Sequence, residues 1–165
     1  MGKLDKPYCA DLRTTPQPEI GTVLVSGATG YIGGRLVQEL MTRGYRVRIL
    51  VRTYSVDYSD RWPGAGIVVG DALDYESMLI ALKDVKVAYY LIHSLLHGRK
   101  NLEELEIKAA TNFRKAAEEN NVERIIYLGG LGDQDCDLSR HLKSRNNVAV
   151  ELVGGKVPVT VLRAA

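Results

Sequence analysis

The segment from Val23 to Gly34 constrains the fold of this chain more than any other feature. It reads VLVSGATGYIGG, which is a short apolar strand, three glycines spaced G-x-x-G-x-x-G, and the start of an amphipathic helix. Gly27 permits a tight exit from the strand, Gly30 leaves the backbone open to a pyrophosphate, and Gly33 lets the helix pack closely on the sheet. The N–H groups of the first helical turn would face the phosphates. The segment therefore predicts a dinucleotide-binding turn, with a tight turn that binds nothing as the alternative.

Composition and charge fit one soluble globular domain. The chain has 165 residues, of which 45% are hydrophobic and 25% charged, and a net charge of +2. This balance gives no argument for nucleic acid or a membrane surface as the main partner. No apolar run approaches the ~18 residues that a membrane span needs. Cys9 and Cys136 show no metal-ligand spacing and are expected to be free thiols in a reducing cytosol, so we predict a cytoplasmic protein without a metal site.

The alternation of short β-branched runs with amphipathic stretches predicts the architecture. Residues 1–19 are polar, contain three prolines and are expected to form a flexible N-terminal tail, whereas residues 20–165 form one domain. Most strand candidates are continuously apolar, as parallel strands buried on both faces are. We therefore predict an α/β fold with a doubly wound parallel sheet of order 3-2-1-4-5-6, and a ligand at the carboxyl ends of the strands where the order reverses. The expected strands are Thr22–Ser26, Arg46–Val51, Gly66–Val69, Val87–Ile92, Arg124–Leu128 and Val159–Arg163.

Helices are expected between these strands. The first follows the glycine-rich turn and ends at Gly44. A short one follows Asp74, which is a favourable N-cap. A longer one begins at Asn101, which has capping-box spacing to Glu104, and a last one runs from about Ser139 to Leu152. The connection between the second and third strands is predicted to be mostly loop.

The end of the second strand bears on which cofactor is preferred. A domain that prefers NAD usually carries Asp or Glu there, which bonds the ribose 2′-hydroxyl. This chain has Arg52, with Arg48 two pleats earlier. A guanidinium can hold a 2′-phosphate through two hydrogen bonds, whereas a carboxylate would repel it. The sequence thus favours NADP(H) over NAD(H), with a solvated cation at the strand end as the alternative reading of Arg52.

A family resemblance rests on four features of the chain. Gly27-Ala-Thr-Gly-Tyr-Ile-Gly33, Arg52 at a strand end, Gly70-Asp71 after the third strand and Tyr127-Leu-Gly-Gly130 in the fifth resemble the atypical short-chain dehydrogenase/reductase superfamily. The resemblance covers about residues 20–165 and is greatest to the NmrA-like, NAD(P)H-binding branch. It implies an NAD(P)-binding Rossmann fold and, in a full-length protein, an NADP-preferring oxidoreductase or an epimerase-like enzyme.

The resemblance also implies roles by position. The glycine-rich turn would line the pyrophosphate, Asp71 and Ala72 would flank adenine, and the end of the fourth strand would pass the ribose toward nicotinamide. Two of these residues have other readings, because Asp71 also suits a turn before a helix and His93 could simply satisfy a local hydrogen bond. The implied cofactor contacts are Gly27, Thr29, Gly30, Tyr31, Ile32, Gly33, Arg52, Asp71, Ala72, Leu91, Ile92, His93, Leu128, Gly129 and Arg145.

The usual catalytic groups of the superfamily are altered here. Classical members carry Ser or Thr at the end of the fifth strand and Tyr-x-x-x-Lys on the next helix, with both helical side chains on one face. This fifth strand ends in Gly129-Gly130, and on the helix either His141 and Arg145 or Ser139 and Lys143 fit the spacing. The resemblance favours the first pair. His141 could transfer a proton near neutral pH, and Arg145 could hold a ribose or phosphate but not release a proton. A basic, solvated start of the helix is the alternative.

Two functions therefore remain open at the level of sequence. Superfamily members usually continue past the sixth strand into segments that form much of the substrate pocket, whereas this chain ends there. We expect a cofactor-binding half, either as a fragment or as a protein that completes its pocket in a homo-oligomer or with a partner subunit. One hypothesis is an enzyme that acts on an unknown small molecule. The other is a non-catalytic NAD(P)H sensor or structural subunit, and an interaction scaffold with an empty site is a third option.

Overall fold

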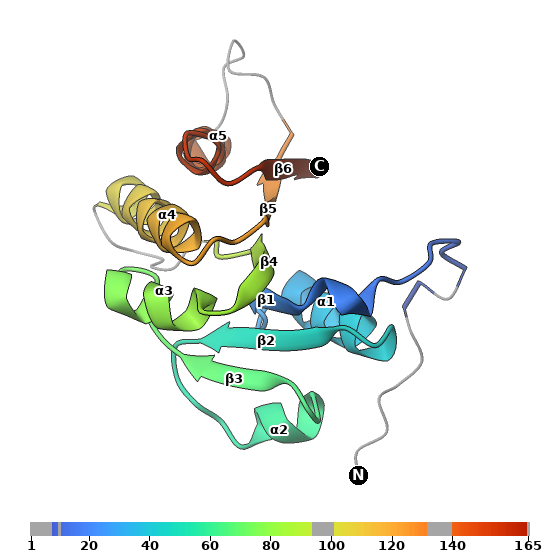
Figure 1. Cartoon of the computed structure of the whole chain (residues 1–165). Coiled ribbons are helices and arrows are strands. Elements are labelled where there is room, and N and C mark those ends of the chain that lie inside the picture. Colours follow the sequence, from blue (N-terminus) through green and yellow to red (C-terminus); the bar gives the residue numbers. More distant parts are fainter. Residues whose placement is uncertain (1–7, 10, 94–100, 132–139, 165) are drawn as a thin grey trace.

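The computed structural model describes residues 8–9, 11–93, 101–131 and 140–164, with Arg140 and His141 described by their backbone alone. Six parallel strands form one sheet in the order β3-β2-β1-β4-β5-β6, with helices on both faces (Figure 1). The predicted fold class and strand order are confirmed. The strands are β1 (Thr22–Ser26), β2 (Arg46–Val51), β3 (Gly66–Val69), β4 (Val85–Tyr90), β5 (Arg124–Gly130) and β6 (Val159–Ala164). The helices are the 3-10 turn η1 (Pro18–Ile20), α1 (Tyr31–Thr42), α2 (Asp57–Arg61), α3 (Tyr75–Leu82), α4 (Leu102–Glu119) and α5 (Arg140–Val153).

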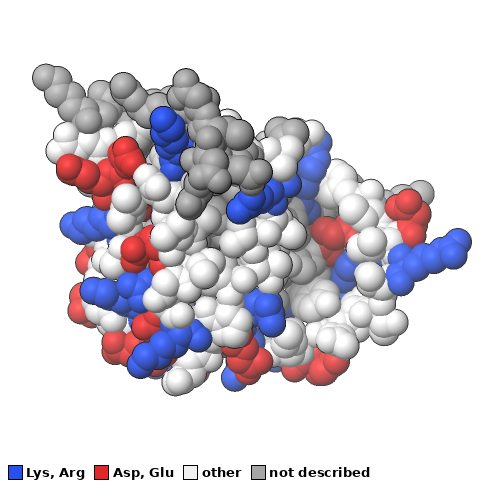
Figure 2. All heavy atoms as spheres, turned by 90° about the horizontal axis from the view of Figure 1, so that it is seen from above, with Lys and Arg blue, Asp and Glu red and all other residues white. Residues whose placement is uncertain are grey.

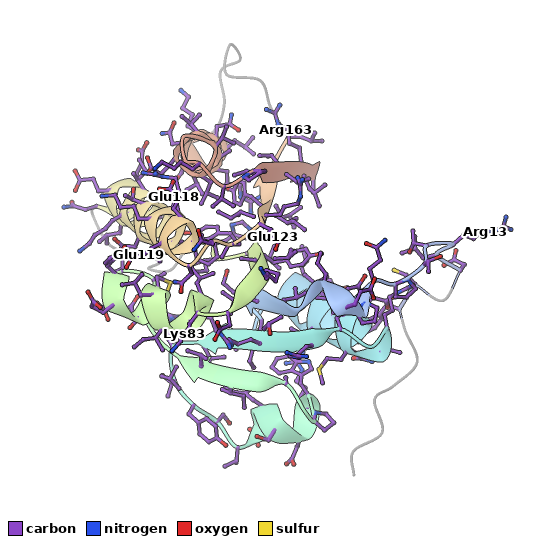
Figure 3. All side chains as sticks on the ribbon, in the orientation of Figure 1. Arg13, Lys83, Glu118, Glu119, Glu123 and Arg163 are labelled. Carbon is purple, nitrogen blue, oxygen red and sulfur yellow. The ribbon has the colours of Figure 1, made fainter. Side chains whose placement is uncertain are left out.

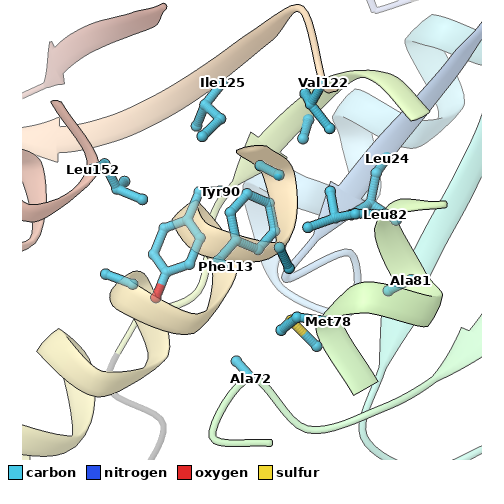
Figure 4. Close-up of a cluster of buried hydrophobic side chains, with 14 of the residues drawn as sticks. Leu24, Ala72, Met78, Ala81, Leu82, Tyr90, Phe113, Val122, Ile125 and Leu152 are labelled. Atoms are coloured by element: carbon cyan, nitrogen blue, oxygen red, sulfur yellow. The ribbon is translucent and has the colours of Figure 1, made fainter. Parts of the chain in front are cut away.

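Two hydrophobic clusters fill the two sides of the sheet. The cluster under α3, α4 and α5 is shown in Figure 4. In it the rings of Tyr90 and Phe113 pack edge to face, with their centroids 5.0 Å apart. The other cluster lies under α1 and α2 and contains the buried Trp62. Leu24 faces the first cluster and its neighbours Val23 and Val25 face the second, because successive side chains of a strand point to opposite faces.

Polar contacts join the helices on the α3–α4–α5 side. Glu118 and Glu119 lie at the carboxyl end of α4 (Figure 3). Glu119 accepts a hydrogen bond from the Tyr75 hydroxyl of α3 at 2.7 Å. Arg114 donates to Glu118 and to Glu151 of α5, at 3.0 and 3.1 Å. These bonds fix α5 against α4, which matters for the site because α5 carries Arg145.

Some boundaries differ from the sequence-based expectations. β4 runs over Val85–Tyr90 and not over Val87–Ile92. Its pairing with β1 begins at Val85, before a register shift between Thr22 and Val23, and the strand ends at Tyr90. The predicted capping box on α4 is wrong, since the side chain of Asn101 makes no capping hydrogen bond. The cap on α3 is confirmed, with the Asp74 side chain accepting from Ser77 N–H at 3.2 Å.

Arg48 does not extend the site on β2. Its guanidinium donates to the carbonyl oxygens of Ala81 and Lys83, at 2.9 Å and 2.5 Å, where α3 ends. The side chain therefore closes the end of a helix on the α3 side of the sheet, while Arg52 stays at the carboxyl end of β2.

Two residues of the N-terminal segment, Tyr8 and Cys9, contact α1. The Tyr8 hydroxyl donates to Gln38 at 3.2 Å, and the Cys9 N–H donates to Glu39 at the same distance. Arg43 in turn donates to the Cys9 carbonyl at 2.8 Å. Cys9 is a free, exposed thiol, whereas Cys136 lies outside the described residues. The flexibility of the N-terminal segment stays a prediction.

Basic and acidic side chains are interspersed on the face shown in Figure 2. This matches the small net charge of +2 over the whole chain. In the part of the chain that the structure describes, no helix is long and apolar enough to cross a membrane, and no three His, Cys, Asp or Glu side chains are grouped as metal ligands.

Candidate functional site

The glycine-rich segment folds into a tight turn between β1 and α1. Gly27 has a positive φ of 72°, and the Gly30 N–H donates to the Gly27 carbonyl at 3.0 Å. α1 then begins at Tyr31. Its N-cap is Gly30, which has no side chain to cap the first N–H groups. The first N–H groups of a helix have no acceptor within the helix. The amino-terminal end of α1 therefore offers backbone donors and a partial positive charge to an anion.

Two glycines of this turn are needed for close packing. A Cβ on Gly33 would lie 2.8 Å from the carbonyl carbon of Gly27 and would overlap its oxygen. A Cβ on Gly27 would equally overlap the carbonyl of Leu91, where the chain leaves β4. Gly30 differs, because a Cβ there would meet only the Gly27 oxygen, at 3.3 Å. Gly27 and Gly33 thus build the turn, while Gly30 keeps its outer surface open.

A buried serine, which the sequence analysis missed, ties the turn to β4. Ser26 is fully buried, and its hydroxyl donates to the Tyr89 carbonyl at 2.8 Å. The Ser26 hydroxyl oxygen also accepts a hydrogen bond from the Leu91 N–H at 3.2 Å. The strand ends β1 and β4 are therefore held together at the point where the sheet order reverses. The one available signal was a polar residue at the end of an otherwise apolar strand.

One cavity of about 370 Å³ opens at this point. It brings together the glycine-rich turn, the carboxyl end of β2 with Arg52, the residues after β4, and Leu128 of β5. Leu50 and Val51, which the sequence analysis did not single out, complete the wall on β2. The sequence-predicted residues that line the cavity are Gly27, Thr29, Gly30, Tyr31, Ile32, Gly33, Arg52, Leu91, Ile92, His93 and Leu128.

An arginine and two tyrosines stand beside the turn. The Arg35 guanidinium lies 3.7 Å from the ring centroid of Tyr31 and 5.2 Å from that of Tyr8. Both distances fall within the range of cation–π contacts. Tyr31 is exposed and lines the cavity, so this contact positions an aromatic ring at the mouth of the site.

Four predicted contacts lie outside the lining of this cavity. The Asp71 carboxylate accepts from the Leu73 N–H at 2.9 Å, which is the turn-forming role that the sequence left open. Ala72 is buried, and its carbonyl accepts from Asn112 at 3.0 Å. Gly129 is buried in β5, and Arg145 lines a second, smaller cavity.

The second cavity, of about 10 Å³, is large enough for one water molecule. It shares Ile92 and His93 with the first cavity, so the two are neighbours. The remaining walls come from α4, β5 and α5, namely Glu106, Tyr127, Arg145 and Val148. Glu106 was missed by sequence analysis, because a glutamate in a helix with many acidic residues gives no signal of its own.

Tyr127 and Arg145 are joined within this small cavity. The Tyr127 hydroxyl donates to the Arg145 backbone carbonyl at 3.1 Å. Burial raises the pKa of Tyr127 to about 12, opposed by the charge of Arg145 and reinforced by that of Glu106. Tyr127 is therefore a neutral hydroxyl at physiological pH. The Nε of Arg145 is buried and has no hydrogen-bond partner among the described residues.

β5 ends in two glycines, so its end carries no side-chain hydroxyl. A Cβ on Gly130 would lie 2.6 Å from Leu142 Cδ2 and 3.3 Å from Arg145 Cδ. A side chain at this position would thus have to displace the side chain of Leu142. His141 lies in the first turn of α5, but its side chain, like the whole of Ser139, is outside the described residues. Lys143, from the other register, is exposed.

Comparison with known proteins identifies the family. The family model described as NmrA-like matches residues 19–143, which is most of the chain. The chain belongs to the NmrA-like family. The predicted resemblance to the NmrA-like branch is thereby confirmed.

Individual relatives differ in what their names describe. The photosystem II assembly factor Ycf39 of Cyanophora paradoxa is 29% identical over 114 residues, covering 68% of this chain and 35% of that protein. A 3-beta-hydroxysteroid dehydrogenase of Mycolicibacterium neoaurum is 28% identical over 134 residues, covering 73% and 36%. The triphenylmethane reductase of Citrobacter sp. complexed with NADP(H) has a TM-score of 0.71 at 23% identity, covering 87% of this chain and 49% of that one. The chain thus spans about a third of these curated relatives and about half of this solved structure.

The different packing of Gly33 and Gly30 leads to a test of the turn. Gly33→Ala forces a Cβ against the backbone of Gly27, so we expect the free energy of unfolding to fall by about 1–3 kcal/mol. Gly30→Ala, the matched control, should lower it by less than about 1 kcal/mol because its Cβ would meet a single atom, the Gly27 oxygen at 3.3 Å, which need shift only slightly. Urea unfolding followed by circular dichroism measures both. Equal losses would contradict the separate roles of the two glycines.

Proposed function

We propose that this chain is the cofactor-binding half of an NmrA-like oxidoreductase and that it binds NADP(H) in the 370 Å³ cavity. One observation carries the proposal. The cavity joins the donor end of α1 to the carboxyl ends of β2, β4 and β5, and a dinucleotide in a doubly wound sheet lies across this crevice. The structurally similar triphenylmethane reductase, which was crystallised with NADP(H), supports the choice of ligand.

Each part of the cavity suits one part of the cofactor. The N–H groups at the start of α1, over Tyr31 to Gly33, would hold the pyrophosphate, and Gly30 would leave room for it. The adenosine half would lie over β2, with Asp71 and Ala72 following the adjacent β3. The nicotinamide half would lie over β4 and β5.

The side chains near the two ends of the dinucleotide have distinct proposed roles. Arg52 is exposed at the end of β2 and would bind the 2′-phosphate of NADP(H). His93 and Leu128 would flank nicotinamide and its ribose, with Gly129 and Arg145 behind them. When bound, the cofactor supplies hydride transfer, and these residues orient it and keep water from the ring.

A binding measurement on the wild-type chain and Gly30→Val tests the proposed function. The valine side chain would occupy the space that we assign to the pyrophosphate, so NADPH affinity should fall by at least about a hundredfold, the loss of several charge-assisted bonds. Titration calorimetry gives the affinity, and circular dichroism checks that the variant is folded. Unchanged affinity in a folded Gly30→Val protein would place the cofactor elsewhere.

The NADP preference has its own test in Arg52→Asp. Replacing the guanidinium by a carboxylate should weaken NADPH by about a hundredfold, because an attraction to the 2′-phosphate becomes a repulsion, and NADH by less than about threefold. Arg48→Asp is not a suitable control, since Arg48 closes the end of α3. Arg46→Asp, on the same strand and exposed at its opposite end, is the better one and should affect neither cofactor. Equal losses of NADPH and NADH in Arg52→Asp would argue against the assignment.

A second function, a sensor or structural subunit that binds NAD(P)H without turnover, is favoured by the end of β5. Gly129-Gly130 supplies no hydroxyl, and Arg145 cannot release a proton. A relative named as an assembly factor is consistent with this alternative. A substrate pocket would then need a partner subunit, a second copy or further polypeptide, since the relatives are about twice as long as this chain.

His141→Ala separates the two functions. If His141 transfers a proton, we expect the variant to lose turnover of carbonyl compounds while its NADPH affinity changes by less than about twofold. The measurement is NADPH oxidation across a panel of aldehydes and ketones, alongside calorimetry. Binding without oxidation by the wild-type protein would favour the sensor, and equal turnover by the variant would exclude the role of His141.

A further inference from the structure

A charged cluster lies directly behind the part of the site that we assign to nicotinamide. Glu106 of α4 and Arg145 of α5 line the small cavity, and His93 lines both this cavity and the larger one. Glu106, Arg145 and His93 are all partly buried. In such surroundings charges are screened less than at the surface, so they act on a neighbouring ring more strongly.

Two tyrosines near this cluster, Tyr127 on the wall of the small cavity and Tyr90 in the core, contribute no charge. Burial raises the pKa of Tyr90 and of Tyr127, and the nearby Glu106 carboxylate adds to both shifts. Both hydroxyls are therefore protonated at physiological pH. The carboxylate of Glu106, the guanidinium of Arg145 and the imidazole of His93 are the ionisable groups left on the walls of the small cavity.

Glu106 belongs to a row of polar contacts between α4 and α5, but it differs from the others in that row. Its carboxylate accepts a hydrogen bond from the Ser144 hydroxyl. One turn earlier, the exposed Glu103 accepts from Asn147 at 2.6 Å, and one turn later Thr111 donates to Glu151 at 2.8 Å. Holding two helices together needs hydrogen bonds and no particular charge. Of these carboxylates, that of Glu106 lines the cavity behind the nicotinamide position.

Charge at this place distinguishes the two redox states of a nicotinamide cofactor. The ring carries a positive charge when oxidised and none when reduced, and the rest of the molecule is the same. A nearby carboxylate therefore favours the oxidised form and a nearby guanidinium favours the reduced form. The Nε of Arg145 is buried without a hydrogen-bond partner among the described residues, so part of this guanidinium lies away from water beside the cavity.

We propose that Glu106 and Arg145 act as an opposed pair that sets the relative affinity of this chain for oxidised and reduced cofactor. Glu106 offsets the guanidinium and allows the oxidised form to bind, while Arg145 favours the reduced form. Both are positioning residues that act through the electrostatic field of the site. This inference rests on the proposed binding of NAD(P)(H), but not on the preference for NADP(H) or on catalysis.

The test is the ratio of the two dissociation constants, Kd for NADP⁺ over Kd for NADPH, measured by calorimetry on the full chain. Glu106→Gln removes the negative charge and should raise this ratio by about three- to tenfold. Arg145→Met removes the positive charge and should lower it by a similar factor, even if both affinities fall. The double variant should return the ratio to within about twofold of the wild-type value.

Three matched variants separate this electrostatic role from a structural one. Ser144→Ala breaks the hydrogen bond to Glu106 but keeps the charge, so the ratio should not move. Glu103→Gln removes a charge from the same row one turn away, at an exposed position, and should also leave the ratio unchanged. Glu106→Asp keeps the charge and should restore a wild-type ratio. Thermal unfolding accompanies each variant.

The possible results distinguish the inference from the proposed function. If the wild-type chain binds neither NADP(H) nor NAD(H), both are overturned. If it binds the cofactor and the ratio of dissociation constants stays constant in Glu106→Gln and Arg145→Met, the inference of an opposed pair is overturned while the proposed function stands. If Ser144→Ala shifts the ratio as much as Glu106→Gln does, Glu106 acts through helix packing and the inference is likewise overturned.

Discussion

The close approach of the β1–α1 turn to the end of β4 is the constraint on which the rest of the site depends. Backbone lies against backbone at two places, Gly33 on Gly27 and Gly27 on Leu91, with no room for a Cβ at either. The buried hydroxyl of Ser26 adds two hydrogen bonds across the same strand ends. β2 and β3 lie on one side of this junction and β5 and β6 on the other, so the sheet order reverses here. Fixing the junction therefore also fixes the shape of the crevice above it.

The sequence predicted the parts of the molecule that depend on local pattern. Glycine spacing, strand hydrophobicity and the Asp74 cap are each read within a few residues, and the sheet order follows from the handedness of the crossovers. The glycine-rich turn, Arg52 and the residues after β4 were expected at one site, and the structure places them around one cavity.

What the sequence could not supply depends on contacts between distant segments. Nothing near Glu106 indicates that it meets Ser144, 38 residues later, because that contact is set by how α4 packs on α5. Arg48 and Arg52 are alike in sequence, yet one closes α3 and the other borders the cavity. The capping box failed at Asn101 for a local reason, because its φ of −114° and ψ of 38° depart from the extended backbone usual at an N-cap and its side chain makes no capping hydrogen bond.

The end of β5 links the packing of the fold to its chemistry. A Cβ on Gly130 would meet the side chains of Leu142 and Arg145 on α5, and β5 ends here in two glycines that carry no hydroxyl. Close approach also buries part of Arg145, which must then be balanced, and Glu106 is the acidic side chain that lines the same cavity. At this edge of the site β5 supplies no hydroxyl, and the charged side chains of α4 and α5 supply an electrostatic field. Such a field acts on the affinity for the cofactor whether or not a substrate is turned over.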